Sequence, residues 1–249
     1  MKFLAFDTST DVMSIAVTNG ARVWQHTGPG GAKASTTLIP AILALLAESG
    51  LLVADLDAIA FGRGPGSFTG LRTACAVAQG LAYGAGGGAG IKVLPIDTLM
   101  AVAEEARFQH GVPATDMKPL HIIALLDARM DEMYVQRFQF VGTQCTAVDA
   151  CELVRPENLA AYLGDDAADS LLAGNVFDVY AGRLASFPNC VNALPTATAL
   201  LRLAPALASS GHCVDAALAL PLYVRDKVAL TTEERAIVKE QKAQDALHR

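Results

Sequence analysis

A glycine-rich loop at residues 61–74, FGRGPGSFTGLRTA, has the residue types that hold a phosphate group against the start of a helix. Backbone N–H groups and the positive end of the helix dipole favour anions there. The candidate contacts are Gly64, Gly66, Ser67 and Thr69. The loop lacks the lysine of a Walker A motif, and a serine or threonine stands where a Rossmann motif has its third glycine. A tight turn with an ordinary helix cap explains the same residues, so both interpretations remain open at this point.

A second polar stretch ends the first predicted strand, where Asp7 precedes three hydroxyl residues, Thr8, Ser9 and Thr10. In a nucleotide-binding hairpin, such hydroxyls and turn amides contact phosphate oxygens while the aspartate orients a metal-bound water. The same residue types also form Asx and Ser/Thr turns that only close a hairpin. These residues alone do not separate a phosphate-binding turn from a structural one.

Composition and charge restrict the function classes. The net charge of −6 argues against a protein that binds nucleic acid by itself, because neutralising phosphates needs a basic face. The five histidines include no pair at i, i+4 spacing, and the five cysteines form no C-x-x-C pair, as is typical of buried thiols in a reducing compartment. No uninterrupted run of about 18 apolar residues predicts a membrane span, and the first residues lack a signal-peptide core. We therefore expect a cytoplasmic protein without a membrane segment and without a metal.

An internal repeat organises the chain, whose 249 residues suit one large domain or two lobes. The stretch ALLDARMDEMYVQRF (124–138) aligns without a gap with LAFDTSTDVMSIAVT (4–18). Three pairs match at one offset: Asp7 with Asp127, Asp11 with Asp131 and Met13 with Met133. Each copy has an apolar strand, an aspartate, a short turn and an alternating strand, which predicts two similar lobes.

Hydrophobic periodicity and Gly or Pro breaks predict the remaining elements. Helices are expected at residues 35–50, 70–84, 97–107, 156–164 and 196–210, and a last one opens with the Thr231-x-x-Glu234 capping box. Strands besides the two hairpins are expected at 56–62, 91–96 and 170–174. This mixture indicates an α/β or α+β class.

One predicted helix is apolar on every side. Residues 38–47, LIPAILALLA, contain no polar side chain, whereas a surface helix normally has a single apolar stripe. The helix at 70–84 is rich in alanine and glycine, which allow close backbone approach. Together these helices are expected to pack on the sheet with one face and on a partner with the other. Burial beneath the protein's own second lobe is the alternative.

Four blocks in this order resemble the TsaB family, also called YeaZ: LAFDTSTDVMSIAV, GRGPGSFTGLRTACAVAQGLA, LLDARMDEMYV and PLYVRDKVALT. The resemblance covers nearly the whole chain. It implies an α/β fold of the ASKHA type (actin/Hsp70-like, RNase H-like), with two lobes from a duplicated βββαβα unit, in agreement with the repeat. On this basis we expect an N-terminal lobe at 1–107, a C-terminal lobe at 108–230 and a helical tail at 231–249.

The resemblance also implies a function in making N-threonylcarbamoyladenosine beside the anticodon of tRNAs that read codons starting with A. There, TsaB-like proteins are the non-catalytic partner of a related TsaD-like protein, joined by the TsaE ATPase, and form a homodimer when alone. tRNA binding is then expected only through the complex. No cofactor of its own is expected, and any ATP or ADP binding is expected to be weak. A self-sufficient ASKHA-type ATPase or phosphotransferase is the alternative, and an M22-type glycopeptidase has less support.

The family's dimer surface maps onto the helices at 35–50 and 67–84, from which we expect interface residues. They are Leu38, Ile39, Ile42, Leu43, Leu45, Leu46, Leu71, Arg72, Ala74, Cys75 and Ala78. TsaD-like relatives carry a metal-binding H-x-x-x-H on the first long helix, but residues 32–43 contain no histidine. The single histidine that the family often shows before the helix proline is also replaced, by Ser35, Thr36 and Thr37. This departure removes the basis for a metal site and counts against peptidase chemistry.

Overall fold

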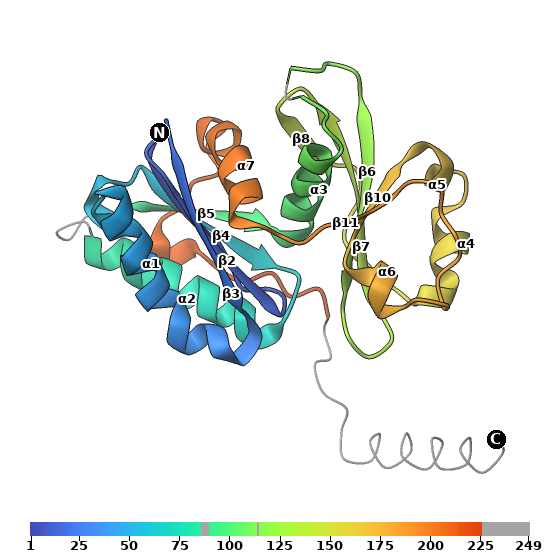
Figure 1. The fold of residues 1–249 in the computed structure, drawn as a ribbon, viewed down its shortest axis with the longest axis horizontal. Helices are drawn as coiled ribbons and strands as arrows, with labels where there is room; N and C mark the ends of the chain where they lie inside the picture. Colours follow the sequence, from blue (N-terminus) through green and yellow to red (C-terminus); the bar gives the residue numbers. More distant parts are fainter. Residues whose placement is uncertain (86–89, 114, 226–249) are drawn as a thin grey trace, which may run out of the picture.

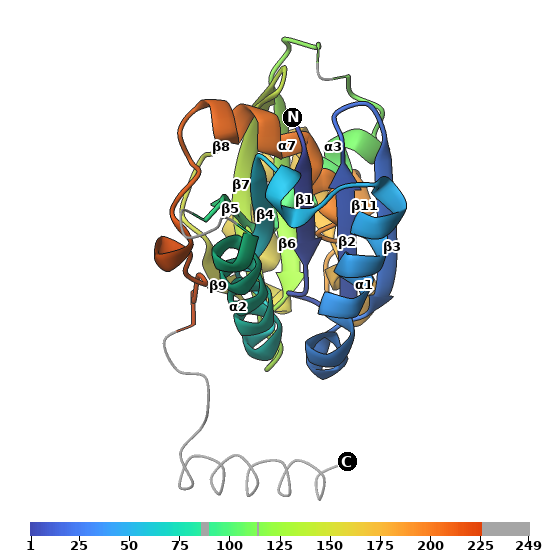
Figure 2. The ribbon, with the colours of Figure 1, turned by 90° about the vertical axis from the view of Figure 1, so that its left-hand side faces the viewer.

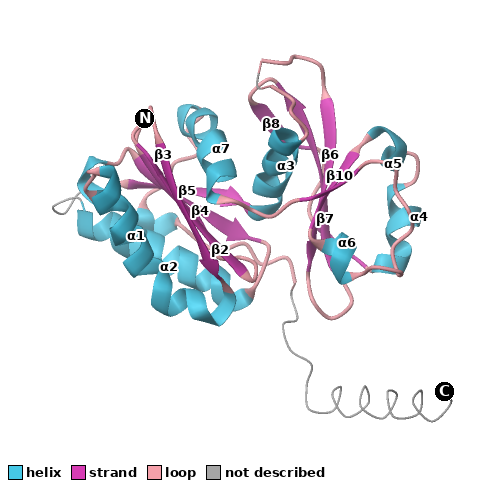
Figure 3. Cartoon of the chain, viewed as in Figure 1, coloured by secondary structure: helices cyan, strands magenta, loops and turns pink. Residues whose placement is uncertain are grey.

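The computed structural model describes residues 1–85, 90–113 and 115–225, which fold into two lobes side by side (Figure 1). Each lobe is built on one mixed sheet with helices on its faces (Figure 3). The predicted two-lobe α/β fold is therefore confirmed. The predicted tail helix at 231–249, with its Thr231-x-x-Glu234 capping box, lies outside the described residues.

The first repeat unit has the order βββαβαβα. Its elements are β1 (Phe3–Asp7), β2 (Val12–Thr18), β3 (Val23–Pro29), α1 (Ala34–Ser49), β4 (Ala58–Gly64), α2 (Phe68–Ala85), β5 (Lys92–Asp97) and α3 (Thr98–Gln109). Its sheet has the strand order β3-β2-β1-β4-β5. The first three strands form an antiparallel meander, while β4 and β5 add in parallel to β1. Each parallel step uses a helix as its crossover.

The second unit repeats this order with shorter helices. Its elements are β6 (Leu120–Asp127), β7 (Met133–Val141), β8 (Gln144–Ala147), β9 (Glu152–Val154), α4 (Leu159–Leu163), α5 (Asp166–Asp169), β10 (Leu171–Gly174), α6 (Val176–Val179), β11 (Cys190–Asn192) and α7 (Ala197–Ser209). The strand order β11-β10-β6-β7-β8 mirrors that of the first sheet, and β9 pairs with β7. The first unit is thus one strand and one helix longer than the expected βββαβα, and the second unit, which also contains β9 and α5, is two strands and two helices longer.

The predicted repeat is visible in the two central strands. Asp7 ends β1 and Asp127 ends β6, so the two aspartates hold equivalent positions. The registers differ by one residue, because Asp7 lies opposite Ser14 whereas Asp127 lies opposite Met133. The second turn is therefore one residue shorter than the gapless alignment implies.

The last helix of each unit packs between the two sheets (Figure 1). Helix α7 buries Leu200 and Ala204 against Phe3 and Ala5 of the first sheet, although it comes from the second half of the chain. Helix α3 buries Val102 and other side chains against β6 and β7 of the second sheet. These two helices therefore pack across the boundary expected between residues 107 and 108, which itself falls within α3.

The other face of the first sheet is covered by α1 and α2, which lie side by side (Figure 2). Strand β1 is buried at all five positions because helices cover both of its faces. Leu4 and Phe6 point toward α1 and α2, while their neighbours point toward α7. As expected, Gly50 ends α1 in the left-handed conformation, with φ of 70°.

Candidate functional site

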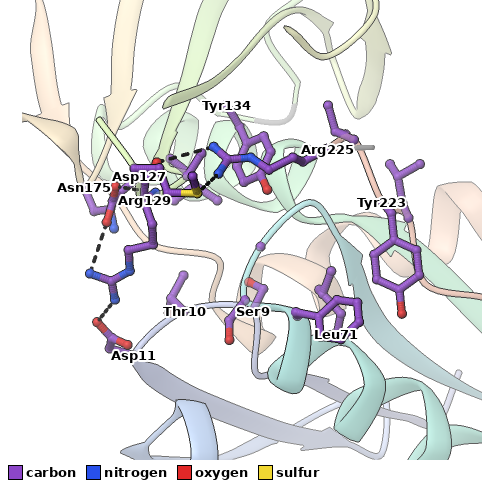
Figure 4. Close-up of a pocket in the computed structure, with 18 residues that line it drawn as sticks. Ser9, Thr10, Asp11, Leu71, Asp127, Arg129, Tyr134, Asn175, Tyr223 and Arg225 are labelled. Atoms are coloured by element: carbon purple, nitrogen blue, oxygen red, sulfur yellow. Dashed lines mark hydrogen bonds and ion pairs between the residues drawn. The ribbon is translucent and has the colours of Figure 1, made fainter. Parts of the chain in front are cut away.

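A cleft with a volume of about 290 Å³ lies between the lobes, and four segments that are far apart in the sequence meet there (Figure 4). Two come from the first lobe, residues 9–11 and 66–68. Residues 126–130 come from the second lobe, and residues 222–225 cross from one lobe to the other. Each segment belongs to one of the four blocks that resemble the TsaB family. The cleft is thus the place where those blocks converge.

Asp7 lies beneath the cleft and is fully buried. Its Oδ1 accepts hydrogen bonds from the Ser9 N–H (2.8 Å) and the Ser9 hydroxyl (2.6 Å). Its Oδ2 has no hydrogen-bond partner among the described residues and packs against Gly62, where a Cβ would lie 1.7 Å away. Burial raises the pKa of Asp7 to about 6, although the two Ser9 hydrogen bonds act in the opposite direction.

The other hydroxyls of the first turn are also engaged inside the protein. The Thr8 hydroxyl is buried and donates to the Gly70 carbonyl at 2.8 Å. The Thr10 hydroxyl bonds to the backbone of Val12, at 3.1 Å to its carbonyl and 3.2 Å from its N–H. The turn therefore satisfies its own polar groups, as a structural Ser/Thr turn does.

The glycine-rich loop docks onto this turn. The Ser67 N–H donates to the Ser9 carbonyl at 2.7 Å. A Cβ at Gly66 would lie 2.6 Å from the Ser9 Cβ, and a Cβ at Gly70 would lie 1.9 Å from the Thr8 carbonyl oxygen. These glycines are needed because the loop and the turn approach each other backbone to backbone.

The structure thus separates the eight candidate phosphate-binding residues into two groups. Four of them line the cleft: Ser9, Thr10, Gly66 and Ser67. The other four do not line it: Asp7, Thr8, Gly64 and Thr69. Thr69 is exposed on α2, whereas the other three are buried. The Ser9 hydroxyl and the Ser67 N–H already bind protein atoms, so these two groups are not free to bind the phosphates of the nucleotide that an ASKHA fold implies.

An ion pair between Arg129 and Asp11 joins the two lobes across the cleft (Figure 4). Arg129 of the second lobe pairs with Asp11 of the first at 2.6 Å, and this contact raises the pKa of Arg129. Arg225 pairs with Glu132 at 2.5 Å, and its Nη1 lies 2.7 Å from the Met130 sulfur. The segment that ends at Arg225 is therefore attached to the second lobe at this point.

The loop that carries these contacts has an unusual backbone. Arg129, Met130 and Asp131 all have positive φ, between 55° and 60°, which costs non-glycine residues energy. Arg183 pairs with Asp131 at 2.6 Å, and the Tyr180 hydroxyl donates to Asp127 at 2.7 Å. These contacts fix the loop in the conformation that presents Arg129 to the first lobe.

The sequence reasoning did not single out Arg129, Glu132 and Arg225. The signal was present, because the first two belong to the D-A-R-x-x-E-x-Y block and the third to the PLYVRD block. Only the fold shows that residues of these blocks contact one another, as Arg225 does with Glu132. In the described part of the chain, no group of three His, Cys, Asp or Glu side chains is placed to hold a metal ion.

A second candidate site is the exposed side of α1 and α2, here called the outer helix face. Its exposed residues are Ile39, Leu43, Ala47, Thr69, Arg72, Ala76 and Tyr83. The exposed fractions of Ile39, Leu43 and Tyr83 are 45%, 51% and 60%. Apart from Arg72 and Glu48, α1 and α2 contain no charged residue. Large exposed apolar side chains on a face with few charges are typical of a protein interface.

The structure narrows the interface expected from sequence. Eight of its eleven residues are buried in the protein's own core: Leu38, Ile42, Leu45, Leu46, Leu71, Ala74, Cys75 and Ala78. One apolar stripe of the helix at 38–47 packs on the first sheet, while apolar residues on its other side are exposed. Ile39, Leu43 and Arg72 are exposed and remain available to a partner.

The segment at 219–225 borders the outer helix face along α2. The Ala219 carbonyl accepts hydrogen bonds from the Cys75 thiol (3.1 Å) and the Gln79 amide (2.9 Å). Farther along, the Leu222 N–H donates to the Arg63 carbonyl at 2.7 Å. This segment, here called the strap, therefore runs along α2 to the cleft and covers one side of the helix.

Comparisons with known proteins find similarity over most of this chain. The chain matches the family model described as TsaD, tRNA N6-adenosine threonylcarbamoyltransferase, over residues 25–247. It is 32% identical to the tRNA threonylcarbamoyladenosine biosynthesis protein TsaB of Haemophilus influenzae over 238 residues, which are 92% of this chain and 95% of that protein. Its identity to TsaB of Escherichia coli is 30% over 250 residues, 92% and 96% of the two chains. The solved structure of YeaZ from Pseudomonas aeruginosa superposes with a TM-score of 0.77 at 35% identity and covers 90% of this chain and 99% of that chain.

Proposed function

We propose that this chain, which belongs to the TsaB family, acts in tRNA threonylcarbamoyladenosine biosynthesis as a subunit without a catalytic centre of its own. In this proposal it binds a TsaD-like protein through the outer helix face, and a TsaE-like ATPase joins the pair. Alone, the chain forms a homodimer through the same face. tRNA is bound only by the complex, in the cytoplasm.

The observation that carries the proposal is the contrast between the polar cleft and the apolar outer helix face. In the cleft, the Ser9 hydroxyl and the Ser67 N–H bind other protein groups, and so does the buried Thr8 hydroxyl beside it. On the outer helix face, Ile39 and Leu43 are about half exposed. Fully burying an exposed Leu or Ile contributes roughly 1.5–3 kcal/mol, so a partner that covers these half-exposed side chains gains about half of that for each.

The membrane plays no part in this proposal. Within the described ranges, no helix has the length and apolar content that a membrane span requires. The net charge of −6 also gives no support to tight tRNA binding by the chain alone.

The test is to mix the purified chain with a TsaD-like protein and to measure mass by light scattering. We expect a heterodimer that replaces the homodimer. The chain alone should bind tRNA weakly at physiological salt and should turn over ATP slowly or not at all. Robust ATP turnover that is lost in Asp7→Ala would instead support the self-sufficient ATPase.

A further inference from the structure

The outer helix face carries a single cation, and its side chain is held in a fixed orientation. The Arg72 guanidinium lies over the Phe68 ring, 3.7 Å from its centroid. Its Nε donates a hydrogen bond to the Tyr223 hydroxyl at 3.1 Å, and the Phe68 and Tyr223 rings are 5.4 Å apart. Two aromatic residues from α2 and the strap therefore position one arginine.

This arrangement leaves part of the guanidinium free. Only Nε of Arg72 takes part in a hydrogen bond among the described residues, so Nη1 and Nη2 remain available. Two parallel N–H donors at the end of a guanidinium fit the two oxygens of a carboxylate. Because the side chain is already oriented, little conformational entropy is lost when a carboxylate binds.

Arg72 also has no counter-charge among the described residues, in contrast to the two arginines of the cleft. Arg129 pairs with Asp11, and Arg225 pairs with Glu132. No carboxylate of the described chain lies within 4.0 Å of the Arg72 guanidinium. When a partner covers this face, the guanidinium loses water, and an unpaired charge that loses water opposes binding.

In a homodimer, α1 and α2 of the second copy offer few carboxylates that could pair with Arg72 and offset its loss of water. Helix α2 contains no acidic residue, and the acidic residue of α1 is Glu48, in its last turn. A different protein with an aspartate or glutamate opposite Arg72 removes the penalty and gains a charge-assisted pair.

We infer that Arg72, oriented by Phe68 and Tyr223, selects a heterologous protein partner over a second copy of this chain by receiving a carboxylate from that partner. The inference rests on the proposed function, because it assigns a specificity-determining residue to the interface proposed there. It identifies the partner by chemistry, as a protein whose matching apolar surface contains one acidic side chain.

The test compares heterodimer and homodimer affinities of the full chain. Arg72→Gln should raise the dissociation constant of the complex with the TsaD-like protein about tenfold and remove most of its salt dependence. Self-association, measured by sedimentation equilibrium, should stay unchanged or tighten. The matched control is Arg22→Gln, since Arg22 also lies over an aromatic ring, that of Trp24, but on the β2–β3 turn. This control should change neither affinity.

Tyr223→Phe serves as a second variant if Arg72→Gln lowers the thermal unfolding midpoint. It keeps the charge but removes the hydrogen bond to Arg72, and it should weaken the heterodimer two- to threefold while leaving self-association unchanged.

Two results would overturn the inference and leave the proposed function standing, provided that Leu43→Glu abolishes partner binding. In the first, Arg72→Gln changes the heterodimer dissociation constant less than twofold. In the second, Arg72→Gln and Glu48→Gln both weaken the homodimer and neither weakens the heterodimer, which would assign Arg72 to self-association. If Leu43→Glu also leaves heterodimer affinity unchanged, the outer helix face is not the interface and the proposed function itself fails.

Discussion

The interlobe cleft and the outer helix face both include residues at or near α2, but they differ in how their side chains are paired. Several polar groups of the cleft bind other groups of the protein, whereas the outer helix face exposes apolar side chains and one arginine that has no carboxylate partner among the described residues. At the cleft, Ser67 at the entrance to α2 donates its N–H to the Ser9 carbonyl, and Arg129 and Asp11 neutralise each other. On the outer helix face, Leu43 is 51% exposed and Arg72 has no described carboxylate near it. The comparison shows that a motif rich in glycine and hydroxyl residues can serve packing, while the exposed alanine- and leucine-rich surface is the one that the proposed function assigns to a partner.

The largest expected effect lies on the outer helix face. Leu43→Glu should raise the dissociation constant for the TsaD-like protein at least about a hundredfold, because an unpaired carboxylate would be buried in the interface. The free energy of unfolding should change by less than about 0.5 kcal/mol, since the side chain is half exposed in the free chain. Titration calorimetry and denaturant unfolding measure the two quantities.

The matched control for this prediction is Val179→Glu. Val179 is 52% exposed, nearly the same as Leu43, but it lies on α6 of the second lobe. Partner affinity should stay within twofold of the wild type. An equal loss of affinity in both variants would mean that added charge, and not its position, weakens the complex.

The next effect concerns the buried carboxyl of Asp7 beneath the cleft. Its pKa is raised by burial from 3.8 to about 6, so the folded state binds the proton more tightly than the unfolded state does. The stabilisation is complete below pH 3.8 and is lost as the pH rises through about 6. The free energy of unfolding should therefore contain a term on the order of 3 kcal/mol that disappears between pH 4 and pH 7.

Asp7→Asn removes this titration and keeps an oxygen for the Ser9 hydrogen bonds. Urea unfolding at several pH values should show that the free energy of unfolding of the wild type, relative to that of the variant, falls as the pH rises from 4 to 7. A difference independent of pH would show that Asp7 has an ordinary pKa and that the cleft floor is open to water.

A smaller effect is expected from the contact between the strap and the second lobe. Glu132→Gln should lower the free energy of unfolding by about 1–2 kcal/mol, because the Arg225 side chain is only 14% exposed and loses its counter-charge. Partner affinity should remain within twofold. As a control, Asp215→Asn breaks an exposed pair with Lys92 and should cost less than about 0.5 kcal/mol.

The sequence predicts the strongly periodic and repeated parts of this fold well. The hairpin repeat, the helices at 35–50 and 70–84 and the Gly50 stop all correspond to observed elements, because each depends on local pattern. Strand β3 was not predicted, since VWQHTGP is an edge strand whose side chains are mostly exposed and lack apolar alternation.

The candidate sites were harder to predict because tertiary contacts decide them. Nothing local to the first turn shows that Thr8 binds Gly70, 62 residues away, or that Ser67 binds Ser9. The strap contact between Arg72 and Tyr223 spans 151 residues, so the fixed orientation of this arginine is visible only in the fold. Amphipathic patterning likewise could not assign Leu38 to the core and Leu43 to the surface of a helix that is apolar all round.

The most direct test of the central claim is threonylcarbamoyladenosine formation on tRNA, reconstituted from this chain, a TsaD-like protein and a TsaE-like ATPase. One variant changes the outer helix face, Leu43→Glu, and one changes the cleft, Ser67→Ala. If the chain acts by binding its partner, Leu43→Glu should reduce product formation to the level seen without this chain. Ser67→Ala should retain at least half of the wild-type rate, because the hydrogen bonds of Ser67 use its backbone N–H and carbonyl, which the variant keeps. The opposite pattern, with an active Leu43→Glu and an inactive Ser67→Ala, would contradict this account and place the function in the cleft.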